Sequence, residues 1–357
     1  MCTLPMMLES ELMYNEIIKE LMEHSCPSIK YRIKKEILED YSGLDQLQYE
    51  VLQDSRVQYV LSWQNNDGYF GEVFHGGWIP WEKRKYSTTG AESALRFLSE
   101  MGLSKEHDFI KRGLDALLRE GWNKGGSKWN FYIPEIGLHG EDYIRSVVYS
   151  YFGIEDCNFI QTEIHRAMEV LIKSKSIQNF DDITGVYKNK RFYNSAIVLP
   201  ETYHIKLLAF TYRWRNEEST GKIKECIEHL LKLSPIPDIY VKYKSQLIAP
   251  AMLFPRDFLK SLKDFTDRDW FPWFHTFELF ARLGVVKDIP QLLSQLDELK
   301  AILQQGEGFF KIKPNDYFFN KWSVYIGLAL ENDWKNERWM YDLTFRSLLI
   351  LKYVGEI

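Results

Sequence analysis

The stretch Trp63–Gly71, with the sequence WQNNDGYFG, decides the fold that the sequence predicts. It lies between two apolar segments that each have the spacing of a helix. Asp67 followed by Gly68 suits a tight turn, and both Gly68 and Gly71 tolerate positive φ angles. We expect Gln64 to bond the end of a neighbouring helix and Asp67 to bond nearby backbone N–H groups. The stretch therefore predicts the loop of a helix–loop–helix unit.

This layout recurs, so internal repetition is the main fold signal. In each of five copies, a segment with apolar residues at i, i+3, i+4 and i+7 precedes a loop, and a second such segment follows. The second segments contain SALRFL (93–98), SVVYSY (146–151), IKLLAF (205–210), TFELFA (276–281) and SVYIGL (323–328). Further helices are predicted at 28–41 and 337–355. Glycines at 102, 153 and 284 stand where helices should end.

Strand signals are scarce, because only IYVKYK (239–244) alternates, and weakly. The loops inside the pairs are long and rich in aromatic residues and glycine, whereas the connections between pairs are brief. Long loops of this kind are usually functional. We therefore predict an all-α fold in which helix pairs close into a ring and the loops cover a central cavity. Residues 1–56 would cap the ring, and residues 57–357 would form it as one compact domain.

The motif also carries a family resemblance. Gln64, Asp67, Gly68, Phe70 and Gly71 resemble the repeated Gln…Asp-Gly-aromatic-Gly segment of the α/α-toroid superfamily of prenyltransferase-like and squalene/hopene-cyclase-like proteins. QQGEGFF (304–310) resembles a degraded second copy. The resemblance implies an (α/α) toroid of about five to six helix pairs and a prenyltransferase-like or terpenoid-cyclase-like protein. The Asp-x-Asp-Asp acid and the Asp-x-Cys zinc signature of the known enzymes are missing.

Composition narrows the class of partner. The net charge is −5, which gives no strong reason to expect nucleic acid or an anionic membrane. No apolar run is long enough to span a membrane. The four cysteines are scattered and form no CxxC, and the N-terminus has no signal-peptide pattern, so we expect a cytoplasmic protein. The sequence identifies no cofactor and leaves the oligomeric state open.

Titratable residues recur just before the apolar core of the second segments. Glu201 and His204 are three positions apart and share a helix face, as Asp142 and Arg145 do. A Glu beside a His suits general acid–base chemistry, and burial can raise the pKa of a carboxyl enough for it to supply a proton. The candidate catalytic residues are Glu201, His204, His275, Asp142 and Glu92. The alternatives are that these groups complement helix dipoles and bond loops, or that they hold a metal.

Aromatic residues make up 15% of the chain, and many fall in the loops. The candidate ligand-binding residues are Trp78, Trp81, Trp129, Tyr132, Tyr193, Trp270, Trp273 and Phe274. A wall of such rings suits polyprenyl chains, carbocations or sugar rings. Two basic clusters, 83–85 and 188–191, could meet a diphosphate or be solvated loop charge. The first hypothesis is an enzyme or binding protein for an apolar, isoprenoid-like small molecule. The alternatives are a carbohydrate-active enzyme and a non-catalytic scaffold.

Overall fold

The computed structural model describes residues 4–71, 74, 78–79, 90–119, 141–249 and 257–357. The chain divides into two compact units. Unit 1 comprises Met1–Gly125, Phe265–Ala281 and Gln295–Ile357, and unit 2 comprises Gly126–Asp264 and Arg282–Ser294. Two of the boundaries between the units, after Ala281 and after Ser294, fall within helices α11 (Trp270–Leu283) and α12 (Pro290–Gln305).

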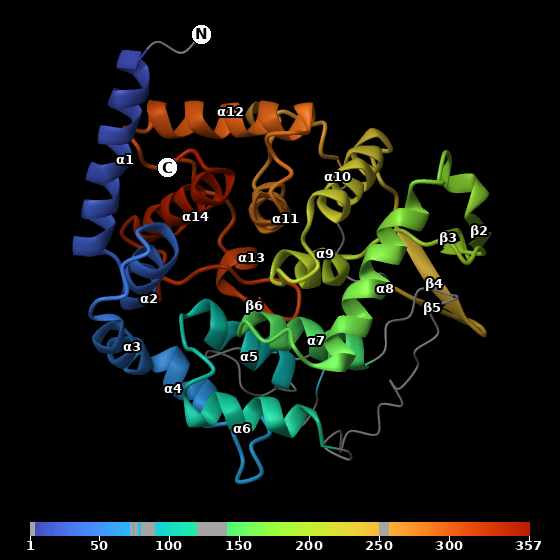
Figure 1. Cartoon of the computed structure of the whole chain (residues 1–357), viewed down its shortest axis with the longest axis horizontal. Helices are drawn as coiled ribbons and strands as arrows, with labels where there is room; N and C mark the ends of the chain where they lie inside the picture. Colours follow the sequence, from blue (N-terminus) through green and yellow to red (C-terminus); the bar gives the residue numbers. More distant parts are fainter. Residues whose placement is uncertain (1–3, 72–73, 75–77, 80–89, 120–140, 250–256) are drawn as a thin grey trace. The chain divides into compact units, whose positions relative to one another are not determined.

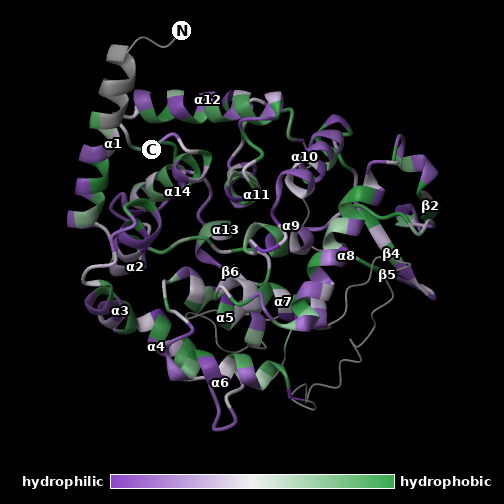
Figure 2. Ribbon diagram, in the orientation of Figure 1, coloured by the Kyte–Doolittle hydropathy of each residue, from purple (hydrophilic) through white to green (hydrophobic). Residues whose placement is uncertain are grey.

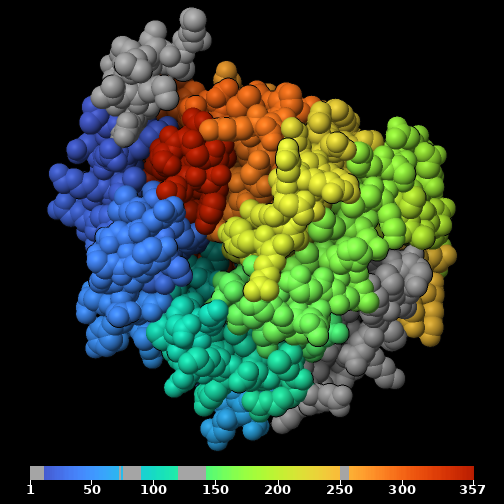
Figure 3. Space-filling view, in the orientation of Figure 1, coloured from blue at the N-terminus to red at the C-terminus, as the bar shows by residue number. Residues whose placement is uncertain are grey.

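Unit 1 is mainly helical and contains both ends of the chain. Its elements are α1 (Leu4–His24), α2 (Pro27–Arg32), a π-helical turn (Ile33–Ile37), α3 (Leu44–Leu52), α4 (Ser55–Leu61), β1 (Trp78–Ile79), α5 (Ala91–Glu100), α6 (Asp108–Leu117), α13 (Tyr317–Asn320), β6 (Trp322–Ser323) and α14 (Arg338–Val354). Helix α14 contacts α1 and the π-helical turn, so the two ends of the chain pack together. The space-filling view shows the red C-terminal residues beside the blue N-terminal ones (Figure 3).

The helices of unit 1 follow from the apolar spacing. In α6, Ile110, Leu114 and Leu117 are buried, whereas Lys111 and Asp115 are exposed. Figure 2 shows this helix banded in hydrophobic and hydrophilic residues. In α14 every residue from 342 to 351 is buried, so this helix forms the centre of the core of unit 1. An amphipathic helix such as α6 covers a core, while one buried on all sides lies inside it.

Unit 2 combines helices with a sheet. Its helices are α7 (Glu141–Tyr151), α8 (Asn158–Ser174), α9 (Thr202–Ala209) and α10 (Glu217–Lys232), and its strands are β2 (Thr184–Tyr187), β3 (Lys190–Tyr193), β4 (Ile239–Tyr243) and β5 (Gln246–Ile248). Helices α7, α8 and α9 pack on one another, and α10 packs on α8 (Figure 1). The sheet has the order β2-β3-β4-β5, in which β3 and β4 are parallel and the outer pairs are antiparallel.

The prediction of an all-α toroid is therefore wrong, because this four-stranded mixed sheet gives the chain α/β content. The strands have only three to five residues, and periodicity is a weak signal over so short a stretch. The turn between β2 and β3 consists of Lys188 and Asn189, both at positive φ, and it contains no glycine that would have marked it.

A second correction concerns residues 323–328, predicted as the last helix of the repeat. They begin with β6 and continue as irregular chain. Gly327 has a φ of +107°, and a Cβ there would lie 2.7 Å from the Trp322 ring, so the backbone turns sharply at this point. Arg96 donates to the carbonyls of Ser323, Ile326 and Gly327, so a side chain satisfies these carbonyls in place of helical N–H groups. The other predicted helices are present, and Gly102, Gly153 and Gly284 at their ends all have positive φ.

Candidate functional site

The turn that opens the repeat is held by side-chain amides. Gln64 Nε2 donates to the carbonyl of Phe109 in the first turn of α6 at 2.7 Å and to that of Gly68 at 3.0 Å. Asn65 Oδ1 accepts the N–H groups of Asp67 and Tyr69, each at 3.0 Å. The role of Asn65 was not predicted, although Asn side chains commonly accept backbone N–H groups in such turns. Gln64 thus joins the turn to α6, and Asn65 organises the turn itself.

The candidate residues of unit 2 converge on the first turn of α9. Glu201 is its N-cap, and its carboxylate accepts the backbone N–H of His204. In return, His204 Nδ1 accepts the backbone N–H of Glu201 at 2.9 Å. This is a capping box with His in the place of the usual Glu or Gln. Because Nδ1 accepts, the proton of the neutral ring is on Nε2.

Two tyrosines complete this group. The ring of Tyr143, from α7, lies 5.0 Å from the His204 ring. The Tyr193 hydroxyl, at the end of β3, accepts the N–H of Leu199 at 3.3 Å. Burial raises the pKa of Tyr193 well above its usual value, and the charge of Glu201 adds to this rise. We call Tyr143, Tyr193, Glu201 and His204 the α9 polar cluster; all four are buried.

Asp142 precedes Tyr143 on α7 but is exposed. Its carboxylate pairs with the guanidinium of Arg145, one turn further along the same helix. The Asp142 side chain is 62% exposed whereas that of Arg145 is 14% exposed, so solvent reaches the pair mainly from the side of the carboxylate. Asp142 is therefore adjacent in sequence to Tyr143, a member of the α9 polar cluster. Its side chain, however, pairs with Arg145.

Unit 1 holds the other candidates. His275 is buried and stacks on Phe271, with ring centroids 5.9 Å apart. Glu92 is buried in the first turn of α5, and its N–H donates to the carbonyl of Phe74 at 3.1 Å. Glu92 and His275 thus belong to a different unit from Glu201 and His204.

Three of the predicted ligand-binding aromatics lie together on α11. Trp273 is fully buried, stacks on Phe277 at 4.7 Å and donates its Nε1–H to Gln295 at 2.9 Å. Its ring is also 6.0 Å from Trp270 and 5.0 Å from Phe274. These rings pack against one another in the edge-to-face and stacked geometries favoured in cores. Trp78 is in β1, opposite Ser323, but its side chain lies outside the described residues, as do Trp81, Trp129 and Tyr132.

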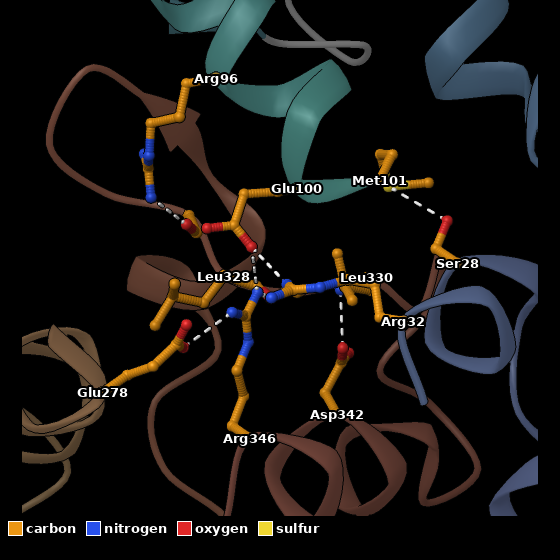
Figure 4. Close-up of polar contacts among 12 residues, drawn as sticks. Ser28, Arg32, Arg96, Glu100, Met101, Glu278, Leu328, Leu330, Asp342 and Arg346 are labelled. Atoms are coloured by element: carbon orange, nitrogen blue, oxygen red, sulfur yellow. Dashed lines mark hydrogen bonds and ion pairs between the residues drawn. The ribbon is translucent and has the colours of Figure 1, made fainter. Parts of the chain in front are cut away.

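A buried ion network in unit 1 was not predicted from the sequence. Arg346 on α14 donates to Glu100 at 2.9 Å and to Glu278 at 3.0 Å, and Arg32 on α2 donates to Glu100 at 2.7 Å (Figure 4). Burial raises the pKa of Glu100, but the field of Arg346, Arg32 and Arg96 outweighs this effect and holds it well below its usual range. We call Arg32, Glu100, Glu278 and Arg346 the arginine network. Its members are too far apart in sequence for a motif to reveal it.

Buried acids also hold the irregular segment before α14. Asp342 accepts the N–H groups of Leu330 at 2.6 Å and Glu331 at 3.1 Å. The Glu331 carboxylate accepts the N–H of Cys26 at 2.8 Å. Burial and the neighbouring Asp342 raise the pKa of Glu331 to about 7. The charge of Glu331 therefore changes near neutral pH.

The described residues contain no cluster of three or more His, Cys, Asp or Glu side chains able to hold a metal ion. Among them, no helix is both long enough and apolar enough to cross a membrane. No protein-family model, curated protein or solved structure matches the chain. The likeness of WQNNDGYFG to the α/α-toroid superfamily accordingly stays a prediction.

Proposed function

We propose that this chain is an enzyme that performs acid–base chemistry on an apolar, isoprenoid-like small molecule at the α9 polar cluster. The supporting observation is a buried tyrosine hydroxyl beside a glutamate whose backbone a histidine holds in place. Shifted pKa values at buried groups with specific charged neighbours are a common mark of functional sites.

Each group has a distinct role in this proposal. The Tyr193 hydroxyl accepts from Leu199, and its own proton has no acceptor among the described residues. A tyrosine hydroxyl is protonated at physiological pH, and the raised pKa of Tyr193 extends this to higher pH, so the hydroxyl is a donor for an oxygen of the substrate. The Glu201 carboxylate is the group that takes up or returns a proton. His204 is a positioning residue, because its Nδ1 fixes the backbone that carries Glu201.

The surroundings of these groups favour an apolar substrate. The buried ring of Tyr143 contacts the His204 ring. Val198 and Leu199, which precede Glu201 in the sequence, are also buried. Small-molecule sites typically combine such an apolar lining with a few placed polar groups. The scattered cysteines of the sequence support a cytoplasmic setting for this activity.

A non-catalytic scaffold is the second candidate, and a specific observation favours it. The α11 rings predicted to face a ligand pack on one another instead, and Trp273 is fully buried. The capping box also gives Glu201 and His204 a structural role in starting α9.

A titration panel separates these candidates. Tryptophan fluorescence is followed while a prenyl alcohol, its diphosphate or a neutral oligosaccharide is added to the full chain. Saturable binding of the prenyl alcohol, with an apolar ligand also retained in native mass spectrometry, supports the proposal. Saturable binding of the oligosaccharide alone replaces it with sugar chemistry, and no saturable binding of any probe favours the scaffold.

A further inference from the structure

The four-stranded sheet of unit 2 has two unlike faces. Thr184 and Tyr193, paired across β2 and β3, are buried, as are Ile239 and Val241 of β4. Because successive side chains of a strand point to opposite faces, the alternate residues share the other face. They are Tyr187, Lys190, Phe192, Tyr240 and Lys242, and we call them the lysine–aromatic face. All five are partly or fully exposed.

The contacts confirm that these side chains share one face. The Lys190 ammonium lies 4.2 Å from the centroid of the Tyr240 ring and donates to its hydroxyl at 3.0 Å. The Lys242 ammonium lies 4.5 Å from the Tyr187 ring and 4.8 Å from the Phe192 ring. Lys188, in the β2–β3 turn, lies 5.2 Å from the Tyr187 ring.

The positive charge of this face is not paired with any carboxylate of the described residues. Within the described residues, Lys188, Lys190 and Lys242 have no carboxylate at ion-pair distance, whereas the neighbouring Arg191 pairs with Asp181. Unit 2 also holds more Lys and Arg than Asp and Glu, although the whole chain carries −5. The negative net charge of the chain therefore does not describe the lysine–aromatic face, which is basic. The local charge of a surface determines which partner it attracts.

The lysines and rings follow the direction of the strands. Phe192 and Tyr240 are neighbours across the parallel pair β3–β4. Lys190 precedes Phe192 by two residues and Lys242 follows Tyr240 by two, so both lysines are close enough to extend over the rings. The Lys188 and Lys242 ammonium groups lie 5.2 Å and 4.5 Å from the centroid of the same Tyr187 ring, so they are within about 10 Å of each other. Gly185 faces Phe192, and a Cβ there would lie 3.0 Å from the ring, so the ring rests across β2.

We propose that the lysine–aromatic face binds single-stranded nucleic acid, with the lysines on phosphates and the rings stacked on bases. A group of cations set beside exposed ring faces matches a short single-stranded segment, in which phosphates alternate with flat bases. A lysine over an exposed ring is stabilised by about 0.5–1 kcal/mol, whereas stacking a base contributes about 1–3 kcal/mol. The ammonium groups can therefore move to phosphates and leave the ring faces to bases. A lipid surface fits less well, because cations at the rings interrupt any apolar patch.

The test is fluorescence anisotropy of a labelled oligothymidylate with the full chain at several salt concentrations. We expect binding at about 50 mM salt that weakens steeply towards 200 mM, with a log–log slope near −2 for three phosphate contacts. The double variant Lys190→Ala/Lys242→Ala should bind at least tenfold more weakly, with a slope shallower by about 1. Phe192→Leu should weaken binding several-fold and leave the slope unchanged, because stacking releases no counterions.

The matched control is Lys173→Ala/Lys222→Ala, which removes the same charge from exposed positions of α8 and α10. It should bind like the parent chain. Equal losses in the two double variants, or no binding by the parent chain at low salt, would overturn the proposal. So would binding to phosphatidylserine vesicles without binding to the oligonucleotide. All variants replace exposed or half-exposed side chains, and far-UV circular dichroism checks that each is folded.

Discussion

His204 Nδ1 lies 2.9 Å from the backbone nitrogen of Glu201, and the hydrogen bond between them closes the first turn of α9. The pair therefore acts as a capping box, while the buried imidazole keeps its proton on Nε2. The spacing of three residues predicted that Glu201 and His204 share a helix face. It did not predict which group donates and which accepts in the hydrogen bonds between them. The stability of α9 and the chemistry proposed for Glu201 depend on the same contact.

Replacing His204 tests the capping role. His204→Ala should lower the free energy of unfolding by roughly 2–4 kcal/mol, because it removes a cap and leaves space in the core. His204→Gln should cost much less, since Gln at this position of a capping box reaches the same N–H group. Urea unfolding measures both, and His165→Ala, at an exposed site of α8, is the control. Equal losses for Ala and Gln would show that the cap contributes little.

Arg346 tests the arginine network. Arg346→Met should destabilise the chain by about 3–5 kcal/mol, because Glu100 and Glu278 lose a buried cation. Adding Glu100→Gln and Glu278→Gln to that variant should recover part of the loss. The control is Arg213→Met, which breaks an exposed pair with Asp156 and should change stability by less than about 1 kcal/mol. If the triple variant is no more stable than Arg346→Met, the loss arises from packing and not from unpaired charge.

Glu331 makes stability depend on pH near neutrality. Its pKa rises to about 7 in the folded chain, so between the unfolded value of 4.5 and 7 the folded state holds more protons. Stability should accordingly fall as pH rises through this window, by at most about 3 kcal/mol. Glu331→Gln should keep an acceptor for Cys26 and make this slope shallower, while Asp342, whose pKa is also raised by burial, still contributes to it. Urea unfolding from pH 4.5 to 8 measures the slope. Glu337→Gln, at an exposed position, should leave the slope unchanged. A slope as steep in Glu331→Gln as in the parent chain would contradict the assignment to Glu331.

Gly68 tests the turn that opens the repeat. It has a φ of +90°, and a Cβ there would lie 2.5 Å from the Arg112 carbonyl oxygen. Gly68→Ala should therefore cost roughly 2–4 kcal/mol of stability, from backbone strain and a clash with backbone. Gly153 also has positive φ but nothing within 4 Å, so Gly153→Ala should cost only about 1–2 kcal/mol. Thermal unfolding compares the two, and equal losses would mean that the close approach to α6 does not matter.

Local patterns predicted the local features well. The apolar spacing of α6 and α14 identified those helices, and Gly102, Gly153 and Gly284 marked helix ends. Such features depend on residues within a few positions of one another.

Contacts between residues far apart in the sequence could not be predicted from such local patterns. The arginine network joins Arg346 to Glu100, which is 246 positions away, and no spacing rule links them. The strands of unit 2 are short, and β3 pairs in parallel with β4 across an intervening helix pair. Asn65, in contrast, stood in the quoted turn, and its tendency to bond amides two residues on could have identified it.

The most direct test of the proposed function is the affinity of Tyr193→Phe for a prenyl alcohol, measured by tryptophan fluorescence. The substitution removes one hydroxyl, and the loss of its hydrogen bond to the ligand should raise the Kd about five- to tenfold. Tyr212→Phe, at a tyrosine that is 53% exposed, should bind like the parent chain. Binding by Tyr193→Phe as tight as that of the parent chain would contradict the role given to this hydroxyl, and with it the α9 polar cluster as the site.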